Sequence, residues 1–387
     1  MKVIISAAGT GGHINPALAI ANNIMKNQPN SEIIFIGTDY GMEQELIPLA
    51  GYDIKSIKAY GFKKEISFNN FKRIFLTFKS IFDVKKIIKE FKPDIVIGTG
   101  GYICVPVMKA ALSMKVPTLL HESNAFPGLA VRLYDGKVDK ILVAFDKTKQ
   151  FFKHKENLVV SGNPSTISMK NYTEQEKRKV KLDLKLNPNL KTIAIFGGSQ
   201  GSVKINDAVT EMLIKKIQNH DMSRYQIVWA TGKDNFETYI NKFKSKGINI
   251  LKIDNLHMVE YIYNMEELLN IADIAITRAG AMTVTELTKV KLPTIFIPFP
   301  TINANKQEEN AKIFKDHSAG IIIRNNELTS KILEQKIEYI LADEILEKYR
   351  KNVNEMSEEV EKQLNNNEVI DNIYNEIIDT IENKKKN

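Results

Sequence analysis

The residues of this chain best suited to chemistry are a histidine and two glutamates, each next to a turn-forming run. His13 closes the run GTGGH, Glu122 lies in HESN, and Glu286 follows RAGAM by a few residues. A neutral imidazole can accept a proton from a hydroxyl group, and a carboxylate can act as a base or accept hydrogen bonds from hydroxyls. These residue types therefore predict acid–base chemistry on a sugar or another alcohol.

The turns themselves are rich in glycine. Four such turns follow short apolar runs, two in each half of the chain: GTGGH at 9–13, GTGGY at 98–102, GGSQG at 197–201 and RAGAMTVTE at 278–286. Glycine lets the backbone turn tightly and approach a ligand, while the next helix offers free N–H groups and the positive end of its dipole. Such turns suit a phosphate or a sugar hydroxyl, and in parallel sheets they gather at the carboxyl ends of the strands.

Each of the three residues also has a structural interpretation. His13 stands in the first turn of an expected helix, where the dipole favours the neutral ring, and it also fits a capping or core histidine. Glu122 either orients His13, acts as the base itself, or caps the helix that starts near Pro127. Glu286 lies about one and a half turns into the helix opened by AGAMT, where a carboxylate accepts both hydroxyls of a ribose or simply faces solvent.

The elements that must position these turns are short strands separated by helical segments. The expected strands are KVIIS, EIIFIG, DIVIG, PTLLH and KILVAF, then TIAIFGG, QIVWATG, DIAIT and PTIFIP. Runs rich in Val and Ile without polar alternation indicate parallel sheets buried on both faces. The sequence therefore predicts the α/β class.

The chain of 387 residues is too long for one ordinary core and suits two domains. The strand series pauses in a polar segment, 160–191, which we interpret as the hinge region. From 344 onwards the chain is rich in Glu, Lys and Asn with a helical pattern, and it ends ENKKKN. We predict domains at 1–161 and 162–343, followed at 344–387 by helices with a frayed basic tail.

Composition and motif spacing exclude several classes. Cys104 is the single cysteine and the six histidines show no metal-ligand spacing, which argues for a reducing, cytosolic setting. No apolar run reaches the ~18 residues of a bilayer span, and glycines interrupt the first run too early for a signal peptide. The chain does not match the dinucleotide-binding fingerprint G-x-G-x-x-G, because its first turn reads GTGGHI and Asp39 lies further along the chain than the acidic residue of that fingerprint. The Walker A pattern is also missing.

The net charge of +8 is compatible with nucleic acid, anionic lipid or an anionic substrate. Residues 62–93 are strongly basic and carry phenylalanines at spacings of three and four: Phe68, Phe71, Phe75, Phe78 and Phe82. A basic amphipathic helix suits an anionic membrane surface, and the alternative is that its apolar stripe packs on the domain core. Nucleic acid is the weaker partner because the chain contains no groove-reading motif.

Taken together, the motifs resemble those of the MurG family of glycosyltransferases in order and spacing, from about residue 2 to about residue 342. The matching runs are GTGGHINPALAIA, GTDYGMEQELIPLAGY, GTGGYICVPV, HESNAFPG, GNP, GGSQGS, RAGAMTVTEL and QEENA. The resemblance implies a GT-B fold, in which two Rossmann-like parallel-sheet domains face each other across a cleft. It assigns the acceptor and the membrane surface to the first domain and the nucleotide sugar to the second. It also implies that the last helices cross back to the first domain.

The resemblance further implies donor-contacting residues in both halves. They are Thr10, Gly11, Gly12, Asn124, Ser199, Ile262, Ala281, Met282, Thr283, Val284, Thr285, Glu286 and Gln307. By this similarity the backbone at Ile262 contacts the uracil, Glu286 the ribose and Gln307 the sugar. Ser199 and Thr283 contact the phosphates.

Three positions depart from the family pattern. An arginine usually follows GNP, but here Thr166 stands at or next to that place, which predicts weaker donor binding or a substitute cation such as Lys170. HESN replaces the commoner HEQN. Cys104 stands where serine is usual, and the last two changes concern acceptor detail only.

The implied reaction moves N-acetylglucosamine from UDP to the C4 hydroxyl of the muramyl sugar of lipid I, with inversion. We assign the base to His13, with Glu122 as its orienter or rival. Helix N-termini would stabilise the departing diphosphate, so we expect no metal and no protein-bound cofactor. The resemblance places the protein peripherally on the cytoplasmic face of the membrane and leaves room for cell-wall synthesis proteins as partners. The alternative is a related transferase acting on another lipid such as diacylglycerol.

Overall fold

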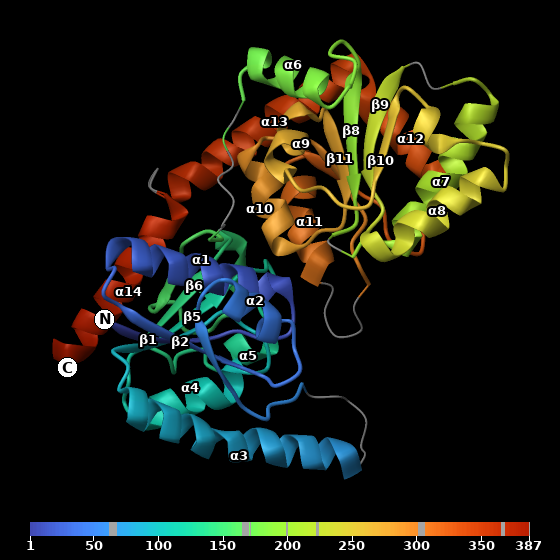
Figure 1. The fold of residues 1–387 in the computed structure, drawn as a ribbon. Helices are drawn as coiled ribbons and strands as arrows, with labels where there is room; N and C mark the ends of the chain where they lie inside the picture. Colours follow the sequence, from blue (N-terminus) through green and yellow to red (C-terminus); the bar gives the residue numbers. More distant parts are fainter. Residues whose placement is uncertain are drawn as a thin grey trace. The chain divides into compact units, whose positions relative to one another are not determined.

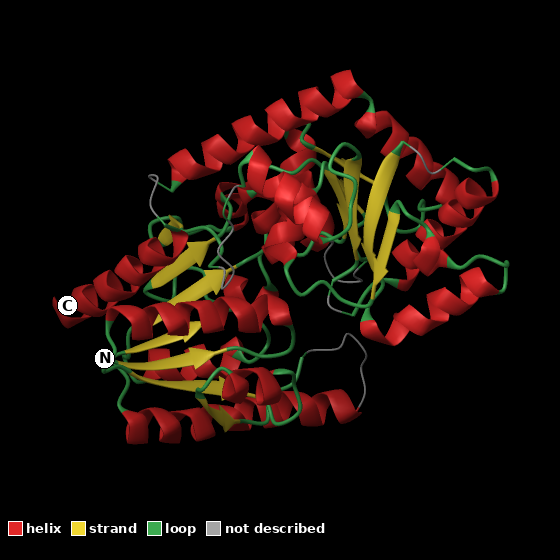
Figure 2. Cartoon of the chain, turned by 45° about the horizontal axis from the view of Figure 1, so that its top comes forward, coloured by secondary structure: helices red, strands yellow, loops and turns green. Residues whose placement is uncertain are grey.

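The computed structural model of the chain describes residues 1–61, 68–164, 170, 172–198, 200–221, 224–300, 306–364 and 368–386, and the side chains at 68–72 and 74 lie outside this description. The contacts divide the chain into two units. Unit 1 comprises Met1–Thr166 and Glu361–Asn387, and unit 2 comprises Ile167–Val360. Each unit holds one parallel sheet with helices on its faces, as Figures 1 and 2 show.

The sheet of unit 1 has seven strands in the order β3-β2-β1-β4-β5-β6-β7. Their bounds are β1 Lys2–Ser6, β2 Glu32–Gly37, β3 Asp53–Ser56, β4 Ile95–Gly98, β5 Thr118–Glu122, β6 Lys140–Val143 and β7 Leu158–Val160. The helices are α1 Gly11–Asn27, α2 Glu43–Leu49, α3 Phe68–Phe91, α4 Cys104–Ser113, α5 Leu129–Arg132 and α14 Val369–Lys386, with the 3-10 helix η1 Asp146–Phe151.

Alternate residues of the strands in unit 1 serve two separate cores. Val3 and Ile5 of β1 pack in one cluster with the apolar side chains of α1 and α14. Ile4, between them, packs in the other cluster with side chains of α3 and α4. Because successive side chains of a strand point to opposite faces, an unbroken apolar strand needs helices on both sides, and these helices provide them.

The sheet of unit 2 has six strands in the order β10-β9-β8-β11-β12-β13. The bounds are β8 Lys191–Phe196, β9 Tyr225–Ala230, β10 Leu256–Val259, β11 Ile274–Thr277, β12 Thr294–Phe296 and β13 Gly320–Ile322. The helices are α6 Glu174–Asp183, α7 Val203–Gln218, α8 Phe236–Lys244, α9 Met265–Ile271, α10 Ala281–Lys289, α11 Lys306–Asp316, α12 Ser330–Leu341 and α13 Asp343–Gln363, with 3-10 helices η2 Lys233–Asn235 and η3 Ile250–Lys252.

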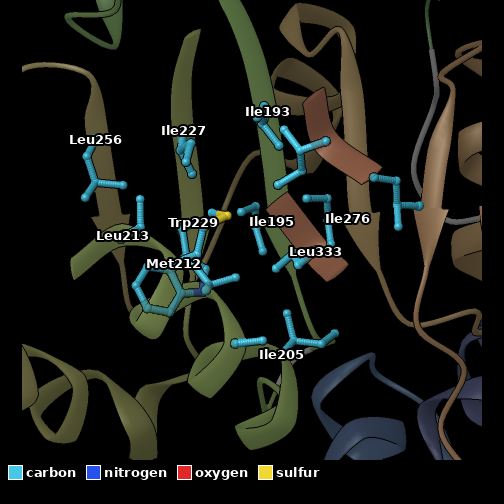
Figure 3. Packing of buried hydrophobic residues seen from close by; sticks show 14 of the residues in the cluster. Ile193, Ile195, Ile205, Met212, Leu213, Ile227, Trp229, Leu256, Ile276 and Leu333 are labelled. Atoms are coloured by element: carbon cyan, nitrogen blue, oxygen red, sulfur yellow. The ribbon is translucent and has the colours of Figure 1, made fainter. Parts of the chain in front are cut away.

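Figure 3 shows the core between this second sheet and helices α7 and α12. Trp229, the single tryptophan of the chain, is fully buried at its centre. Its indole N–H donates to Oδ1 of Asn206 on α7 at 3.1 Å, so the polar edge of the ring is satisfied inside the core.

The strands expected from the sequence are all present, and the strands that the sequence analysis missed are β3, β7, β10 and β13. These are the outermost strands of the two sheets. Each is short and only partly buried, since an edge strand has a neighbour on one side only. The continuous apolar run that marks an interior strand is therefore absent from them.

The C-terminal helices belong to different units. Leu346 of α13 packs in the core of unit 2, whereas Ile373 and Ile377 of α14 pack on α1 and the sheet of unit 1. The return to the first unit thus takes place at the end of α13 and not from residue 344. The basic end, expected to be frayed, is helical to Lys386, and Lys384 Nζ donates to Asp139 Oδ1 at 2.7 Å.

The segment interpreted as a hinge contains a helix, α6. Thr173 and Glu176 form a capping box at its start: the Glu176 carboxylate accepts from the Thr173 N–H at 2.8 Å, and the Thr173 hydroxyl accepts from the Glu176 N–H at 3.3 Å. This reciprocal pair satisfies backbone donors that a helix start leaves open. The pattern Thr-x-x-Glu was visible in the sequence, and it marks this helix more clearly than the polar composition marks a hinge.

Candidate active site

One candidate site lies where the strand order of unit 1 reverses. β1 pairs with β2 on one side and with β4 on the other, so the turns that follow β1 and β4 are neighbours at the carboxyl edge of the sheet. Such a reversal is where open parallel sheets bind ligands. Thr10 is the extended N-cap residue of α1, and Gly11 and Gly12 form its first turn; Thr10 and Gly12 are exposed.

His13 joins these two turns. Its Nδ1 lies 3.1 Å from the carbonyl oxygen of Thr99, and the Thr99 hydroxyl donates back to the His13 carbonyl at 2.8 Å. A carbonyl oxygen only accepts, so Nδ1 must carry the proton. In the neutral ring the lone pair that can take a proton is then on Nε2. The structure therefore holds His13 in the tautomer that a general base at Nε2 requires.

The glycines after β4 are needed because the imidazole occupies the space beside them. Gly100 and Gly101 both have positive φ, and a Cβ at Gly100 would come within 2.8 Å of His13 Nδ1. A side chain there would also strain the backbone. This turn is thus shaped around the histidine.

Cys104, one of the departures from the family pattern, contacts the backbone of the same turn. The side chain is fully buried, and its Sγ donates to the Gly100 carbonyl at 3.0 Å and lies 3.3 Å from the Ser6 hydroxyl. Burial raises the pKa of the thiol to about 11, so it stays protonated and can donate. A thiol in this place therefore makes a bond that a serine hydroxyl could also make.

Glu122 is buried and organises the loop that follows β5. Its Oε1 accepts from the backbone N–H and the side-chain amide of Asn124 at 2.9 and 3.0 Å, and its Oε2 accepts from the N–H of Gly128 at 2.6 Å. Gly128 is the N-cap residue of α5. These bonds agree with the capping alternative for Glu122. They also fix the side chain of Asn124, a predicted donor contact.

Glu43, to which sequence reasoning gave no role, holds the first turn from the other side. The carboxylate is fully buried, accepts from the N–H of Gly9 at 3.1 Å and from the N–H of Thr38 at 3.0 Å. It therefore ties the turn after β1 to the turn after β2. A glutamate in the first turn of a helix usually reads as a surface residue, so spacing alone offered no signal for this role.

Another candidate site lies at the equivalent reversal in unit 2. β8 pairs with β9 and β11, so the turns at 197–201 and 278–280 are neighbours. A Cβ at Gly201 would lie 1.9 Å from the Thr231 carbonyl oxygen, which excludes any side chain there. The turn can pack this tightly only because Gly201 has no side chain. The hydroxyl of Ser202 then caps α7 by accepting from the Ile205 N–H.

A pocket of about 580 Å³ opens at these turns. Its lining includes Gly197, Gly198, Arg278, Gly280, Thr283 and Gln307, so both glycine turns, the first turn of α10 and the start of α11 contribute. The N-termini of α7 and α10 both border it. A diphosphate suits such a place because free backbone N–H groups and the positive ends of two dipoles converge there.

Arg278, quoted in its motif but given no role from the sequence, lines this pocket. Its guanidinium donates to the Ser202 hydroxyl at 2.7 Å, to Asn325 Oδ1 at 2.8 Å and to the Ile297 carbonyl at 2.9 Å. Burial lowers its pKa to about 10, which still leaves it charged at neutral pH. It thus adds a fixed positive charge while joining three loops.

Glu286 follows Thr283 by three residues on α10, so the two side chains share one face of that helix. Burial raises the pKa of the Glu286 carboxyl to about 7. Within the described chain, its carboxylate has neither a hydrogen-bond partner nor an ion-pair partner. Burying a carboxyl without a hydrogen-bond donor beside it destabilises the folded protein, and such groups are typical of ligand-binding sites.

Gln307 is held by its carbonyl end. Oε1 accepts from the N–H of Phe299 at 2.8 Å and from the N–H of Ala279 at 3.2 Å. This leaves the Nε2 group as the end that can donate to a ligand. Of the other predicted residues on α10, Ala281 and Val284 are buried, whereas Met282 and Thr285 are partly exposed.

Ile262 lies apart from this pocket, in the loop after the edge strand β10. It is partly buried between two exposed tyrosines, Tyr261 and Tyr263, whose rings pack edge to face at 5.2 Å. Ser199 and Thr166, also named from the sequence, lie outside the described residues. Lys170, the proposed substitute cation, pairs with Glu176 at 2.8 Å at the start of α6.

One group of carboxylates in the described part of the chain has metal-like spacing: Asp221, Glu334 and Glu338. The ammonium of Lys216 lies 2.9 to 3.3 Å from all three and is almost fully buried. The lysine already supplies the positive charge that a metal would bring. This group is therefore best explained as an ion-pair network that anchors α7 to α12.

Comparison with known proteins places these features in a family. The profile of the glycosyltransferase family 28 N-terminal domain matches residues 3–143, and that of the family 28 C-terminal domain matches residues 192–368. A protein of Acetivibrio thermocellus named "UDP-N-acetylglucosamine--N-acetylmuramyl-(pentapeptide) pyrophosphoryl-undecaprenol N-acetylglucosamine transferase" is 38% identical over 384 residues, covering 99% of both chains. A protein of Alkaliphilus oremlandii with the same name is 40% identical over 344 residues, covering 89% of this chain and 91% of its own.

Solved structures agree on the fold. The crystal structure of Acinetobacter baumannii MurG has a TM-score of 0.72 at 23% identity and covers 95% of this chain and 99% of its own. A UDP-glucose: anthocyanidin 3-O-glucosyltransferase in complex with UDP has a TM-score of 0.66 at 14% identity, covering 99% of both chains. These matches confirm the α/β class and the GT-B fold. With relatives 38% identical over nearly its whole length, the chain belongs to the MurG family of N-acetylglucosamine transferases, within glycosyltransferase family 28.

Proposed function

We propose that this chain transfers N-acetylglucosamine from UDP-N-acetylglucosamine to the C4 hydroxyl of the muramyl sugar of lipid I, which gives lipid II for peptidoglycan. The names of the full-length relatives contain this donor and this undecaprenyl-linked acceptor. The observation that carries the proposal is the fixed tautomer of His13, because a sugar hydroxyl needs a base to become a nucleophile.

In the proposed reaction Nε2 of His13 takes the proton of the C4 hydroxyl while that oxygen attacks the anomeric carbon of the donor. The bond from the anomeric carbon to the β-phosphate oxygen breaks, its electron pair leaves with UDP, and the configuration inverts. The proton passes from His13 to solvent afterwards. Glu122 supports the loop that carries Asn124 and takes no part in proton transfer, in line with its hydrogen bonds.

Unit 2 supplies the stabilisation of the leaving group in this proposal. The diphosphate binds at the glycine turns, where the N-termini of α7 and α10 and the charge of Arg278 face the pocket. Glu286 accepts the ribose hydroxyls, Gln307 donates to the sugar, and the backbone at Ile262 contacts the uracil. Fixed dipoles of this kind stabilise developing negative charge without reorganising during the reaction.

A membrane-bound acceptor must be met at the bilayer surface, and α3 offers a surface for this. Phe75, Phe78 and Phe82 are 68%, 57% and 72% exposed, so these rings do not pack on the core as the structural alternative required. Lys79 and Lys86 are exposed on the same helix, in the same stripe at spacings of three and four. The side chains of Phe68 and Phe71 lie outside the described residues.

We therefore assign the stripe formed by Phe75, Phe78, Lys79, Phe82 and Lys86 to an anionic lipid surface, with the aromatic rings in the interface and the lysines at the headgroups. No helix in the described part of the chain is long and apolar enough to cross a bilayer. In this proposal the protein lies on the cytoplasmic face, where UDP-linked sugars are available.

Replacing His13 tests the base. With a soluble short-chain lipid I analogue, His13→Ala should lower kcat for UDP release by about a hundredfold or more, the usual contribution of a general base, with little change in KM for the donor. Imidazole in the buffer should restore part of the rate, because the lost group is a proton acceptor. UDP release is measured by a coupled assay.

The exposed His154 gives the matched control, and His154→Ala should behave as wild type. Undiminished activity in His13→Ala would rule out His13 as the base. UDP release with diacylglycerol but not with the lipid I analogue would instead transfer the assignment to the rival acceptor.

The pKa of Glu286 predicts how donor binding depends on pH. The carboxyl titrates at about 7, and only its ionised form can accept both ribose hydroxyls. Affinity for UDP-N-acetylglucosamine should therefore be highest above pH 7 and should fall below it, by up to about tenfold per pH unit. Titration calorimetry across this range measures the effect, and the intact nucleotide sugar is used because its phosphates do not titrate there.

Glu286→Gln should bind the donor more weakly than wild type above pH 7, and its affinity should no longer change with pH. Glu237, an exposed glutamate on α8, provides the control, since Glu237→Gln should keep the wild-type pH profile. An unchanged pH dependence in Glu286→Gln would mean that another group titrates with donor binding.

The aromatic stripe of α3 predicts a further effect on membrane binding. The triple variant with Phe75, Phe78 and Phe82 changed to Ser should bind vesicles of phosphatidylglycerol and phosphatidylcholine at least about tenfold less, because the apolar contact is lost. Sedimentation of vesicles measures it. Turnover of the soluble analogue should stay near wild type.

The control changes Leu182, Leu251 and Tyr339, exposed apolar residues of unit 2, to Ser. This variant should bind vesicles as wild type does. Equal binding by the two triple variants would show that α3 is not the membrane surface.

A further inference from the structure

A cluster of tyrosines stands at the same sheet edge as His13. Tyr40, Tyr60 and Tyr102 come from the loops after β2, β3 and β4; β2 and β4 pair with β1, and β3 pairs with β2. The rings of Tyr40 and Tyr60 stack nearly in parallel, with centroids 5.8 Å apart and planes 12° from parallel. The hydroxyls of Tyr40 and Tyr102 lie 3.0 Å apart.

The hydrogen bonds give the cluster a defined direction. Tyr40 donates its single hydroxyl proton to the carbonyl oxygen of Ala59 at 2.8 Å, so Tyr102 must donate to Tyr40. Burial and the neighbouring Tyr102 hydroxyl raise the pKa of Tyr40, which keeps its phenol neutral. The oxygen of Tyr102 then retains lone pairs that can accept from a ligand.

Arg73 of α3 adds a positive charge to the tyrosine cluster. The guanidinium carbon of Arg73 lies 5.3 Å from the centre of the Tyr60 ring. Thr77, one turn further along α3, locks this arrangement: its hydroxyl accepts from the Tyr60 N–H at 3.0 Å and donates to the Arg73 carbonyl at 2.9 Å. The backbones that carry Arg73 and Tyr60 are thus held together by one buried side chain, so the contact between arginine and ring is built into the fold.

The cluster reaches from the His13 turn to the membrane stripe. The Tyr102 ring lies against Gly9 and Gly61, since a Cβ at either glycine would fall within 4.0 Å of it. Gly9 belongs to the GTGGH turn, and Arg73 precedes Phe75 of the stripe by two residues. Tyr40 is 54% exposed and Tyr60 is partly buried, so the cluster is accessible through Tyr40.

We propose that Arg73, Tyr60, Tyr40 and Tyr102 form a subsite for the acceptor, in which Arg73 binds the diphosphate and the tyrosines hold the sugar that leads from it to His13. This inference rests on the proposed function, since it concerns that acceptor. An acceptor whose lipid lies in the bilayer carries its diphosphate at headgroup depth, and Arg73 stands next to the stripe assigned to that depth. A guanidinium suits a diphosphate because it can donate several charge-assisted hydrogen bonds at once.

The tyrosines suit the next part of the acceptor. Each presents a flat apolar ring with a polar tip, which matches a sugar that has apolar and hydroxyl faces. Tyr60 also has a second task, because its ring carries the guanidinium. Tyr60 is therefore a positioning residue for Arg73, whereas Arg73 contacts the substrate directly.

The test compares acceptor and donor parameters of the full-length protein in buffer without vesicles, with the soluble short-chain lipid I analogue. Arg73→Gln should raise the acceptor KM about tenfold or more, as expected for loss of a charge-assisted hydrogen bond, with kcat and the donor KM near wild type. Calorimetry of the same analogue without donor should show the same loss in affinity.

Variants of Tyr60 separate positioning from general damage. Tyr60→Phe keeps the ring that carries the guanidinium, so its acceptor KM should stay well below that of Arg73→Gln, whereas Tyr60→Leu removes the ring and should raise the acceptor KM towards that of Arg73→Gln. Lys2→Gln is the matched control, because Lys2 Nζ also lies over an aromatic ring, that of Phe91, but at the amino end of β1. It should leave the acceptor KM unchanged.

The outcomes distinguish this inference from the proposed function. Wild-type turnover with the analogue, together with an unchanged acceptor KM in Arg73→Gln, would overturn the subsite and leave the proposed function intact. An effect of Arg73→Gln that appears only when vesicles are present would assign the arginine to a lipid headgroup and also overturn it. A wild-type protein that neither binds nor turns over the analogue would remove the proposed function, and the subsite with it.

Discussion

The hydrogen bond from His13 Nδ1 to the Thr99 carbonyl oxygen is the interaction on which the rest of the site depends. It joins the turn after β1 to the turn after β4, and it decides which ring nitrogen can accept a proton. The glycines of the second turn are needed because the ring fills the space beside them. The buried Glu43 and Cys104 hold the two turns from either side. The fold thus places the histidine and also fixes the tautomer of its neutral ring.

The two units use the same topology for different purposes. In unit 1 the reversal of strand order presents the imidazole of His13 and, next to it, the hydroxyls and rings of the tyrosine cluster. In unit 2 the equivalent reversal presents helix N-termini and Arg278, which suit a diphosphate. Glu286 is the exception there, a carboxyl whose burial raises its pKa to about 7. Such a group costs stability without a ligand, so its presence agrees with a role in donor binding.

The sequence predicted the central strands of both sheets but not the edge strands. Strands with neighbours on both sides are continuous apolar runs, and each of them was found. The edge strands β3, β7, β10 and β13 have mixed burial, and their composition resembles that of loops. The helix α6 was missed although its capping box was legible, because polar composition was given more weight than the Thr-x-x-Glu spacing.

The site shows the same division. The glycine turns, His13 and Glu286 could be singled out in the sequence because their residue types are unusual at strand ends. The roles of Glu43, Arg278 and the tyrosine cluster depend on contacts between loops that are distant in sequence, such as Tyr40 with Tyr102 or Arg278 with Asn325. Periodicity and local spacing hold no information about such pairs. For Glu122 the sequence left three roles open, and its hydrogen bonds to Asn124 and Gly128, which agree with the capping role, became visible only in the structure.

The most direct test of the account is the tautomer of His13 in solution. Nitrogen-15 NMR of protein labelled at histidine distinguishes the protonated from the unprotonated ring nitrogen, and His13→Gln identifies the signals among the six histidines. We expect a neutral ring with the proton on Nδ1 and the lone pair on Nε2. A proton on Nε2 in the neutral ring would contradict it, because the nitrogen assigned to the base would then have no lone pair to offer.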